Sequence, residues 1–207
     1  MAWVKICGIT NIEDAQKADR LGADALGFIF APSPRKVEVE NARRIIDNLG
    51  EKVEKIGVFL DHDIGEVKRI AEKCGLTGIQ FHGSESPEYL QNFEFYTIIK
   101  SIRVNRERGW DEIEKYREVA DRLLLDTYVD GKPGGTGNCF PWELIREYDF
   151  GGVPVIVAGG ITPDNVLDAL GSAPLYGIDV CSGVEEVPGK KSKVKLKRIF
   201  EKIGLGG

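Results

Sequence analysis

The sequence KICGIT at positions 5–10 ends the first apolar run of the chain with a thiol. A deprotonated cysteine is both a base and a nucleophile, so Cys7 is the first residue in the chain that could do chemistry. The preceding apolar residues predict a short strand, and Thr10 with Asn11 predicts a helix cap, which places Cys7 in a strand-to-helix turn. Ligands of α/β proteins bind at such turns. The alternative is a small, buried and inert cysteine.

Polar residues or glycines also follow six later apolar segments. They are Arg35, His82, Arg103, Asp126, Gly159 with Gly160, and Asp179 with Ser182 and Gly183. Each has an ordinary structural explanation when taken alone: Asp126 could cap a turn, Arg35 could pair on the surface, and His82 could be a structural hydrogen-bonding group. Together they supply an acid, a base and cations at the ends of several strands, which is how active sites of β/α barrels are built.

Eight repeated units carry these residues. After the strand near Cys7, the apolar runs predict strands at 25–30, 54–60, 77–81, 96–104, 122–127, 154–158 and 176–180. Helical spacing predicts helices at 11–21, 38–49, 64–74, 86–92, 110–120, 141–148, 163–170 and 192–203. Strands that alternate with helices imply a parallel sheet, and eight units favour a closed (β/α)8 barrel. We therefore predict an α/β protein, with residues 1–207 forming a single TIM-barrel domain with short helices.

The glycines after the last two predicted strands indicate an anion site. Gly159 with Gly160, and Ser182 with Gly183, let backbone N–H groups approach a ligand closely. Their place matches the phosphate site formed by the loops after strands 7 and 8 of many barrels. The loop GKPGGTG at 131–137, which includes Gly135, suits a lid over a phosphorylated substrate. It lacks the GxxxxGK[ST] pattern of a P-loop.

Composition excludes several other classes of protein. A net charge of −5 and a pI near 5.3 argue against a nucleic-acid binder, and the basic run at 190–198 has the helical spacing of a solvated helix face. The chain has neither a signal-peptide pattern nor an apolar run approaching the roughly 18 residues of a membrane helix, so we expect a cytoplasmic protein without membrane contact. Its four cysteines are far apart, which suits reduced thiols, and its two histidines form no zinc motif.

Several motifs, taken in order along the chain, resemble the phosphoribosylanthranilate isomerase family of tryptophan biosynthesis. They are KICGIT at 5–10, GFIF with SPRKV at 27–37, GVF at 57–59, IQFHG at 79–83, LLLDT at 123–127, GGTG with Phe140 and Trp142, PVIVAGG at 154–160, and IDVCSGVE with PGKK at 178–191. The resemblance covers nearly the whole chain. It implies the third step of tryptophan synthesis from chorismate, an Amadori rearrangement of N-(5-phosphoribosyl)anthranilate to 1-(2-carboxyphenylamino)-1-deoxyribulose 5-phosphate.

The resemblance also implies a role for each site residue. Asp126 would be the general acid that protonates the ribose ring oxygen, and Cys7 the general base that removes a proton from the adjacent carbon. Arg35 would bind the anthranilate carboxylate, with Asp179 and His82 also at the substrate. The phosphate would be held by the residues already placed in the anion site: Gly135, Gly159, Gly160, Ser182 and Gly183. The family uses no metal and no organic cofactor.

These roles require opposite pKa shifts in the acid and the base. A free carboxyl has a pKa near 4 and a free thiol one near 8.5, so both would be in the wrong state at neutral pH. We expect burial to raise the pKa of Asp126, and Arg35 or nearby N–H donors to lower that of Cys7. Cys181 departs from the family, which usually has serine there, so we leave it out of the phosphate site because a thiol is a weaker donor.

Two other interpretations compete with this one. The first is the histidine-pathway isomerase that rearranges a phosphoribosyl imidazole substrate; that family uses aspartates as both acid and base, so Cys7 argues against it. The second is a catalytically silent barrel that only binds a phosphorylated metabolite or a partner, which we would expect to have lost Cys7 or Asp126. The sequence leaves a monomer and a homodimer equally open.

Overall fold

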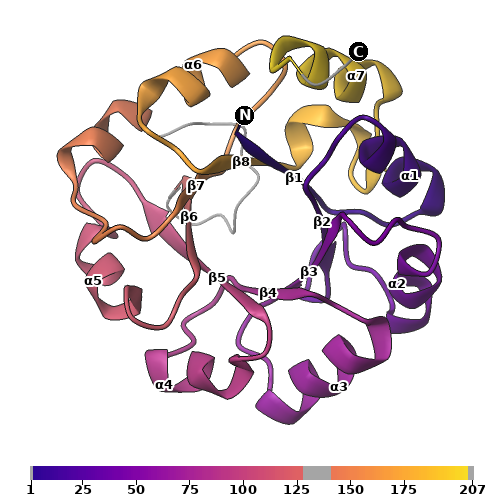
Figure 1. Cartoon of the computed structure of the whole chain (residues 1–207), viewed down its shortest axis with the longest axis horizontal. Helices are drawn as coiled ribbons and strands as arrows, with labels where there is room; N and C mark the ends of the chain where they lie inside the picture. Colours follow the sequence, from indigo (N-terminus) through magenta and orange to yellow (C-terminus); the bar gives the residue numbers. More distant parts are fainter. Residues whose placement is uncertain (1, 128–140, 205–207) are drawn as a thin grey trace.

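Eight parallel strands close into a barrel in the computed structural model, which describes residues 2–127 and 141–204 (Figure 1). They are β1 (Trp3–Cys7), β2 (Ala25–Ile29), β3 (Glu54–Phe59), β4 (Gly78–Phe81), β5 (Thr97–Val104), β6 (Arg122–Thr127), β7 (Val155–Val157) and β8 (Gly177–Val180). Each strand pairs with the next along the chain, and β8 pairs with β1, which brings Lys5 beside Asp179. The predicted (β/α)8 barrel is confirmed.

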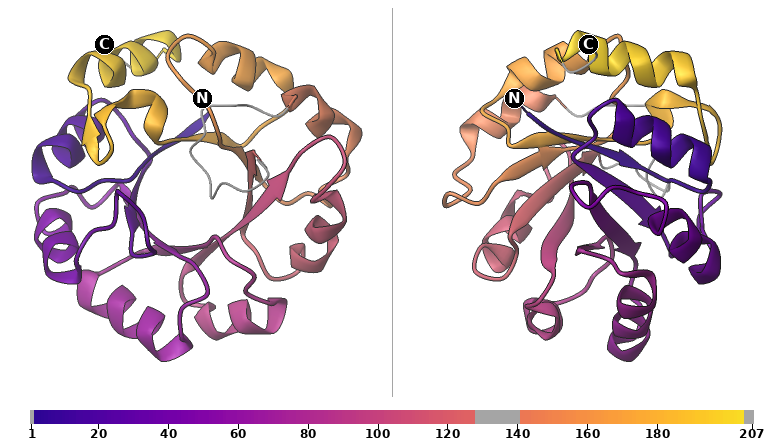
Figure 2. Two further views of the ribbon diagram at one scale, coloured as in Figure 1. Left: turned by 180° about the vertical axis from the view of Figure 1, so that it is seen from behind. Right: turned by 45° about the vertical axis from the view of Figure 1, so that its right-hand side comes forward.

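Helices surround the barrel on its outer side, as both views in Figure 2 show. They are α1 (Ile12–Arg20), α2 (Val39–Ile46), α3 (Ile64–Cys74), α4 (Pro87–Leu90), α5 (Ile113–Tyr116), α6 (Val166–Ser172) and α7 (Lys193–Lys202). The side chains of Asn11, Asp63 and Ser192 accept hydrogen bonds from N–H groups of the first turns of α1, α3 and α7, which fixes where these helices begin. Within residues 2–127 and 141–204, no helix is long and apolar enough to cross a membrane.

Three predicted segments differ from the structure. The helix expected at 110–120 is a 3₁₀ turn, Trp110–Glu112, followed by the four-residue α5. The helix expected at 141–148 is a 3₁₀ helix, Trp142–Glu147, which buries Trp142 and Ile145. The loop expected after the eighth strand contains an antiparallel hairpin, β9 (Glu185–Val187) with β10 (Lys190–Lys191).

The barrel has an apolar interior that does not extend to its carboxyl end. Inward-facing side chains form a small core: Trp3, Ala25, Ile56, Ile99, Leu124, Ile156 and Ala158. Alternate residues of the same strands face outward and join a larger core beneath the helices. Further along the inward faces, the side chains become polar, with Lys5, Gln80, Asp126 and Asp179 all buried. This polar layer is the base of the candidate site.

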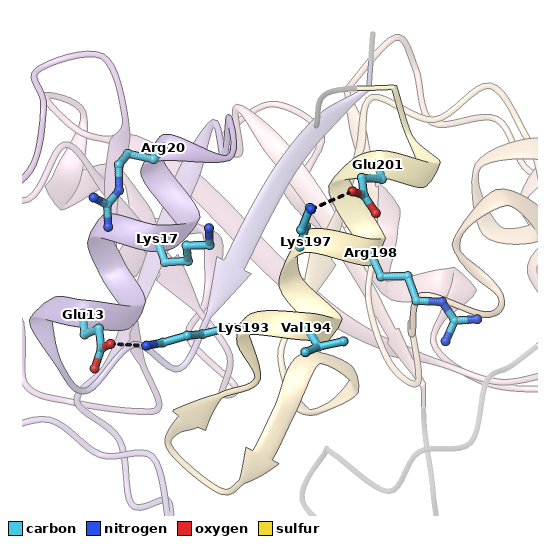
Figure 3. Close-up of a pocket in the computed structure, with 8 residues that line it drawn as sticks. All are labelled: Glu13, Lys17, Arg20, Lys193, Val194, Lys197, Arg198 and Glu201. Atoms are coloured by element: carbon cyan, nitrogen blue, oxygen red, sulfur yellow. Dashed lines mark ion pairs between the residues drawn. The ribbon is translucent and has the colours of Figure 1, made fainter. Parts of the chain in front are cut away.

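The last helix presents most of the basic run to solvent, as predicted. Its inner face buries three apolar side chains: Leu196, Ile199 and Phe200. On its outer face, Lys193 pairs with Glu13 of α1, and Lys197 pairs with Glu201 (Figure 3). These cations are therefore neutralised by neighbouring carboxylates on the outside of the barrel.

Lys191 is the exception to that prediction. Its side chain is 1% exposed, and its Nζ lies 3.0 Å from Glu185 Oε1 and 3.1 Å from the carbonyl oxygen of Cys181. The sequence run suggested a solvated lysine, but the β9–β10 hairpin folds this one inward. The ion pair with Glu185 therefore holds the Lys191 ammonium close to the strand ends, where it lowers the pKa of Cys7.

Candidate active site

A cavity of about 440 Å³ opens at the carboxyl ends of the strands. Nine of the ten residues predicted from the sequence line it: Cys7, Arg35, His82, Asp126, Gly159, Gly160, Asp179, Ser182 and Gly183. The tenth, Gly135, lies outside the described residues. Segments that are far apart in the chain thus place the predicted acid, base and anion-binding groups around one space.

A larger groove of about 610 Å³ lies between α1 and α7 (Figure 3). It is lined by lysines, arginines and glutamates of the two helices, with Val194, and it contains none of the predicted site residues. Three of its five basic groups, Lys193, Lys197 and Arg198, already have carboxylate partners. We therefore place the site in the smaller cavity, where the predicted polar side chains surround one space.

The thiol of Cys7 lies at the end of β1 and is 5% exposed. A hydrogen bond from the Cys181 thiol lowers the pKa of Cys7 well below its usual value, and the ammonium groups of Lys5 and Lys191 act in the same direction against the opposing effect of burial. The same hydrogen bond, together with burial, raises the pKa of Cys181. The Cys181 thiol therefore favours the deprotonated form of Cys7. The predicted direction for Cys7 is confirmed, although the main causes are Cys181 and Lys5 rather than Arg35.

Lys5 and Asp179 form a buried ion pair beneath this thiolate. Lys5 Nζ lies 2.9 Å from Asp179 Oδ2, and the side chains are 0% and 8% exposed. Burial alone would lower the pKa of Lys5, but attraction to Asp179 and Cys7 outweighs it and raises the pKa. Burial raises the pKa of Asp179 to about 7 against the attraction of Lys5. Asp179 lines the cavity, and its Oδ1 is buried without a hydrogen-bond partner among the described residues.

Asp126 lies at the end of β6, with its two oxygens in different surroundings. Oδ1 accepts a hydrogen bond from the Thr127 N–H at 2.8 Å, and Oδ2 lies 3.5 Å from His82 Nε2. Gly159 has a positive φ of 82°, and a Cβ there would lie 2.8 Å from Asp126 Oδ1. Glycine is therefore required at 159 both for its backbone conformation and to leave room for the carboxyl. The expected protonation of Asp126 stays a prediction.

Backbone groups dominate the cavity wall between β7 and β8. Gly183 packs so tightly on the preceding loop that a Cβ there would lie 1.8 Å from the carbonyl oxygen of Ile161. Gly159, Gly160 and Ser182 complete this wall. A surface made of glycine backbone allows close approach to an anion, so the arrangement suits phosphate, and phosphate binding stays a prediction.

Arg35 reaches the cavity with part of its guanidinium already bound. Its Nε lies 2.9 Å from Glu185 Oε1, and its Nη2 lies 2.7 Å from Glu185 Oε2. Glu185 also accepts from Lys191, so one carboxylate holds two cations at the rim. The predicted contact between Arg35 and a substrate carboxylate stays a prediction. It must use guanidinium N–H groups that are not bound to Glu185.

Five residues of this site were missing from the predicted set: Gln80, Lys5, Cys181, Glu185 and Lys191. For the first of them the sequence carries a signal. Gln80 precedes His82 by two positions, as Lys5 precedes Cys7 and Asp179 precedes Cys181, and residues two apart on a strand share a face. A polar residue at an inward position of an otherwise apolar strand therefore indicates a side chain that contacts and positions the residue at the strand's end.

Known proteins share both this sequence and this barrel. Residues 4–202 match the family model described as N-(5'phosphoribosyl)anthranilate (PRA) isomerase. The chain belongs to the phosphoribosylanthranilate isomerase family. Curated members of the family include the isomerase of Desulforudis audaxviator, 45% identical over 97% of each chain, and that of Moorella thermoacetica, 43% identical over 98% of this chain and 90% of the relative.

Solved structures of the family superpose closely on this barrel. The phosphoribosylanthranilate isomerase of Thermotoga maritima has a TM-score of 0.90 at 37% identity, with 97% of this chain and 98% of that chain covered. A structure of a family member in complex with reduced 1-(o-carboxyphenylamino)-1-deoxyribulose 5-phosphate has a TM-score of 0.84 at 36% identity, with 97% of both chains covered. Another concerns monomers generated from the dimeric T. maritima enzyme, with a TM-score of 0.84 at 35% identity over 100% of this chain and 98% of that chain.

Replacing Cys181 tests how this member of the family holds its thiolate. Cys181→Ala removes the donor to Cys7, and hydrogen bonds to charged groups contribute about 1.5–3 kcal/mol, so the pKa of Cys7 should rise by roughly 1–2 units. Because the thiolate is the deprotonated form, its titration should move to higher pH. The ultraviolet absorbance of the thiolate, with Cys7→Ala as the baseline, measures this shift. Cys181→Ser retains an O–H donor, so the pKa of Cys7 should shift less in this variant. If Cys7 titrates at the same pH in the wild type, Cys181→Ala and Cys181→Ser, Cys181 is not its hydrogen-bond donor.

Replacing Lys5 tests the ion pair through stability. In Lys5→Met, Asp179 loses its cation, so its pKa should rise further above about 7 and the folded state should keep a proton that the unfolded chain releases. The free energy of unfolding should then fall with rising pH by about 1.4 kcal/mol per unit above pH 7, where the wild-type Asp179 is mainly ionised and contributes little slope. Urea unfolding at several pH values measures the slope. The double variant Lys5→Met/Asp179→Asn should lose this pH dependence. If the slope persists in the double variant, it arises from a group other than Asp179.

Proposed function

We propose that the chain catalyses the Amadori rearrangement of N-(5-phosphoribosyl)anthranilate to 1-(2-carboxyphenylamino)-1-deoxyribulose 5-phosphate, in tryptophan biosynthesis. The observation that carries this proposal is one cavity that contains the Cys7 thiolate, the Asp126 carboxyl and a glycine-lined wall. An aldose-to-ketose rearrangement needs one group to give a proton and another to remove one, and the cavity supplies both. Membership in the isomerase family supports the same reaction.

The first step is the opening of the ribose ring, with Asp126 as general acid. Asp126 gives a proton to the ring oxygen, the bond between this oxygen and the anomeric carbon breaks, and the substrate nitrogen shares its electron pair with that carbon to form a Schiff base. The reaction leaves Asp126 as a carboxylate. Its Oδ1 is held by the Thr127 N–H, so Oδ2 is the oxygen placed to carry the transferred proton.

The second step is the removal of a proton from the neighbouring carbon, with Cys7 as general base. The thiolate takes the proton, and the electron pair of the C–H bond moves to form an enolamine. The enolamine then tautomerises to the ketoamine product. A lowered thiol pKa favours the deprotonated form of Cys7, which the hydrogen bond from Cys181 and the charge of Lys5 stabilise until the substrate arrives.

The substrate spans the cavity between two anion-binding ends. The glycine wall formed by residues 159–160 and 182–183, with help from Gly135, holds the phosphate, and Arg35 binds the anthranilate carboxylate through the donors that Glu185 leaves. Asp179 Oδ1 is an acceptor suited to a ribose hydroxyl. The reaction moves only protons and electron pairs within one molecule, so it needs no redox cofactor, and the steps described above use no metal. We place the enzyme in the cytoplasm, as a monomer or homodimer whose substrate is a small phosphorylated molecule.

The loss of phosphoribosylanthranilate fluorescence on adding the protein tests this function. The wild-type protein should consume the substrate, and Cys7→Ser and Asp126→Asn should each lower kcat at least about 100-fold, because general acid and base groups contribute roughly 10²–10⁴-fold. Cys74→Ala and Asp47→Asn are matched controls, since Cys74 ends α3, Asp47 is the C-cap residue of α2, and neither lines the cavity. They should keep wild-type kcat.

The same assay with the phosphoribosyl imidazole substrate of the histidine pathway tests the rival activity. Turnover of that substrate alone would replace the proposed function. No turnover of either substrate, with a phosphorylated analogue still bound, would identify a silent binding barrel.

A further inference from the structure

Three polar side chains form a line across the floor of the cavity, from β4 to β6. Gln80 is 2% exposed, and its Nε2 lies 3.3 Å from His82 Nδ1. The other ring nitrogen, His82 Nε2, lies 3.5 Å from Asp126 Oδ2. Gln80 is not used in the two proton transfers described above, yet it contacts the imidazole that faces the general acid.

The chemistry of the amide fixes the state of the imidazole. A neutral histidine has one N–H and one nitrogen lone pair, whereas an amide NH₂ can only donate. With Gln80 Nε2 facing Nδ1, the lone pair must be on Nδ1 and the hydrogen on Nε2. The Nε2–H then faces Asp126 Oδ2. In the described part of the chain, Gln80 is the one side chain that hydrogen bonds to the His82 ring, and Asp126 Oδ2 lies 3.5 Å from its Nε2.

This tautomer matters because of what Asp126 has to do. A lone pair on Nε2 would be a base directly beside the acid and would compete with the ribose oxygen for the proton of Asp126. An N–H at the same place cannot accept that proton, and it donates to the carboxylate that remains after the transfer. The Nε2–H form of His82 therefore favours proton delivery to the substrate.

The charged groups around this line do not replace the role of Gln80. Arg103 lies beside Asp126 in the β5–β6 register, Asp179 faces the cavity from β8, and Cys7 with Lys5 faces it from β1. Arg35 lines the opposite wall, bound to Glu185. All of these act through charge. Among the described residues, only Gln80 hydrogen bonds to Nδ1, the atom whose state sets the tautomer.

We propose that Gln80 is a positioning residue that fixes the Nε2–H tautomer of His82, and that this imidazole orients Asp126 for proton transfer. The inference rests on the proposed function because it assigns the support of the general acid in that reaction. It also explains a buried amide in an apolar strand. Gln80 Oε1 is buried and has no partner in the described residues, whereas Nε2 contacts His82, so the amide is held by its NH₂ end.

The tautomer can be measured directly, because the chain contains only two histidines, His62 and His82. His62 is outside the cavity, so the ring nitrogens of a labelled His62→Gln protein report on His82 alone by NMR. We expect the Nε2–H tautomer when the ring is neutral, and a mixture of tautomers once Gln80→Leu is added. A Nδ1–H tautomer in the His62→Gln protein would overturn the proposal, and this measurement needs no substrate and no change in the cavity.

Kinetics in two backgrounds separate support of His82 from direct contact with the substrate. Gln80→Leu should lower kcat on the order of tenfold with little change in KM. His82→Gln keeps an amide donor towards Asp126 and should retain more activity than His82→Leu. Glutamine has no imidazole tautomers, so in the His82→Gln background Gln80→Leu should lower kcat by less than about twofold. Gln91→Leu, on the exposed surface, is the matched control and should leave kcat unchanged.

The outcomes distinguish this inference from the proposed function. An equal loss from Gln80→Leu in both backgrounds would assign Gln80 to the substrate and overturn its positioning role. An active wild-type enzyme with a Nδ1–H His82 would overturn this inference alone. A wild-type protein that does not turn over phosphoribosylanthranilate would overturn the proposed function, while the tautomer of His82 would still be established by NMR.

Discussion

The Lys5 ammonium is the charge on which the site depends. It is fully buried, and an unpaired ammonium in that position would cost several kcal/mol. Two groups lie close enough to compensate it, Asp179 and the Cys7 thiolate. Burial raises the pKa of Asp179 to about 7, so near neutral pH Asp179 is ionised only part of the time and neutralises Lys5 incompletely. The positive charge of Lys5 then acts more strongly on the Cys7 thiolate. The free-energy cost of burying the Lys5 ammonium is thus partly offset by its attraction to the Cys7 thiolate, which is the form of the base that the reaction needs.

Support for the reacting groups comes from the strands rather than from the loops. Lys5, Gln80 and Asp179 each lie two residues before a side chain at the rim, so each pair points to the same side of its strand. The lower member is buried in the barrel, where neighbours on adjacent strands limit its movement. A reacting group held from below by a packed strand keeps its geometry while substrates bind and leave.

The sequence predicts the architecture well because parallel strands covered on both faces appear as continuous apolar runs. It also predicts the rim, since Cys7, His82 and Asp126 directly end such runs. It does not predict which rim groups touch. The contact of Cys7 with Cys181, and that of Arg35 with Glu185, join residues more than a hundred positions apart through the β1–β8 pairing and the β9–β10 hairpin, and no local pattern specifies these contacts. The same hairpin makes Lys191 a buried cation within a run that is otherwise solvated.

The seam between the first and last strands has a consequence for synthesis of the chain. Cys7 emerges early from the ribosome, but Asp179, Cys181 and Lys191, which neutralise Lys5 or stabilise the thiolate, are made last. Until β8 pairs with β1, the nascent chain has a cysteine without the surroundings that make it basic. Its thiol is then as weakly acidic as that of a free peptide and correspondingly less reactive toward the electrophiles and oxidants of the cell. Reactivity therefore develops only when the barrel closes.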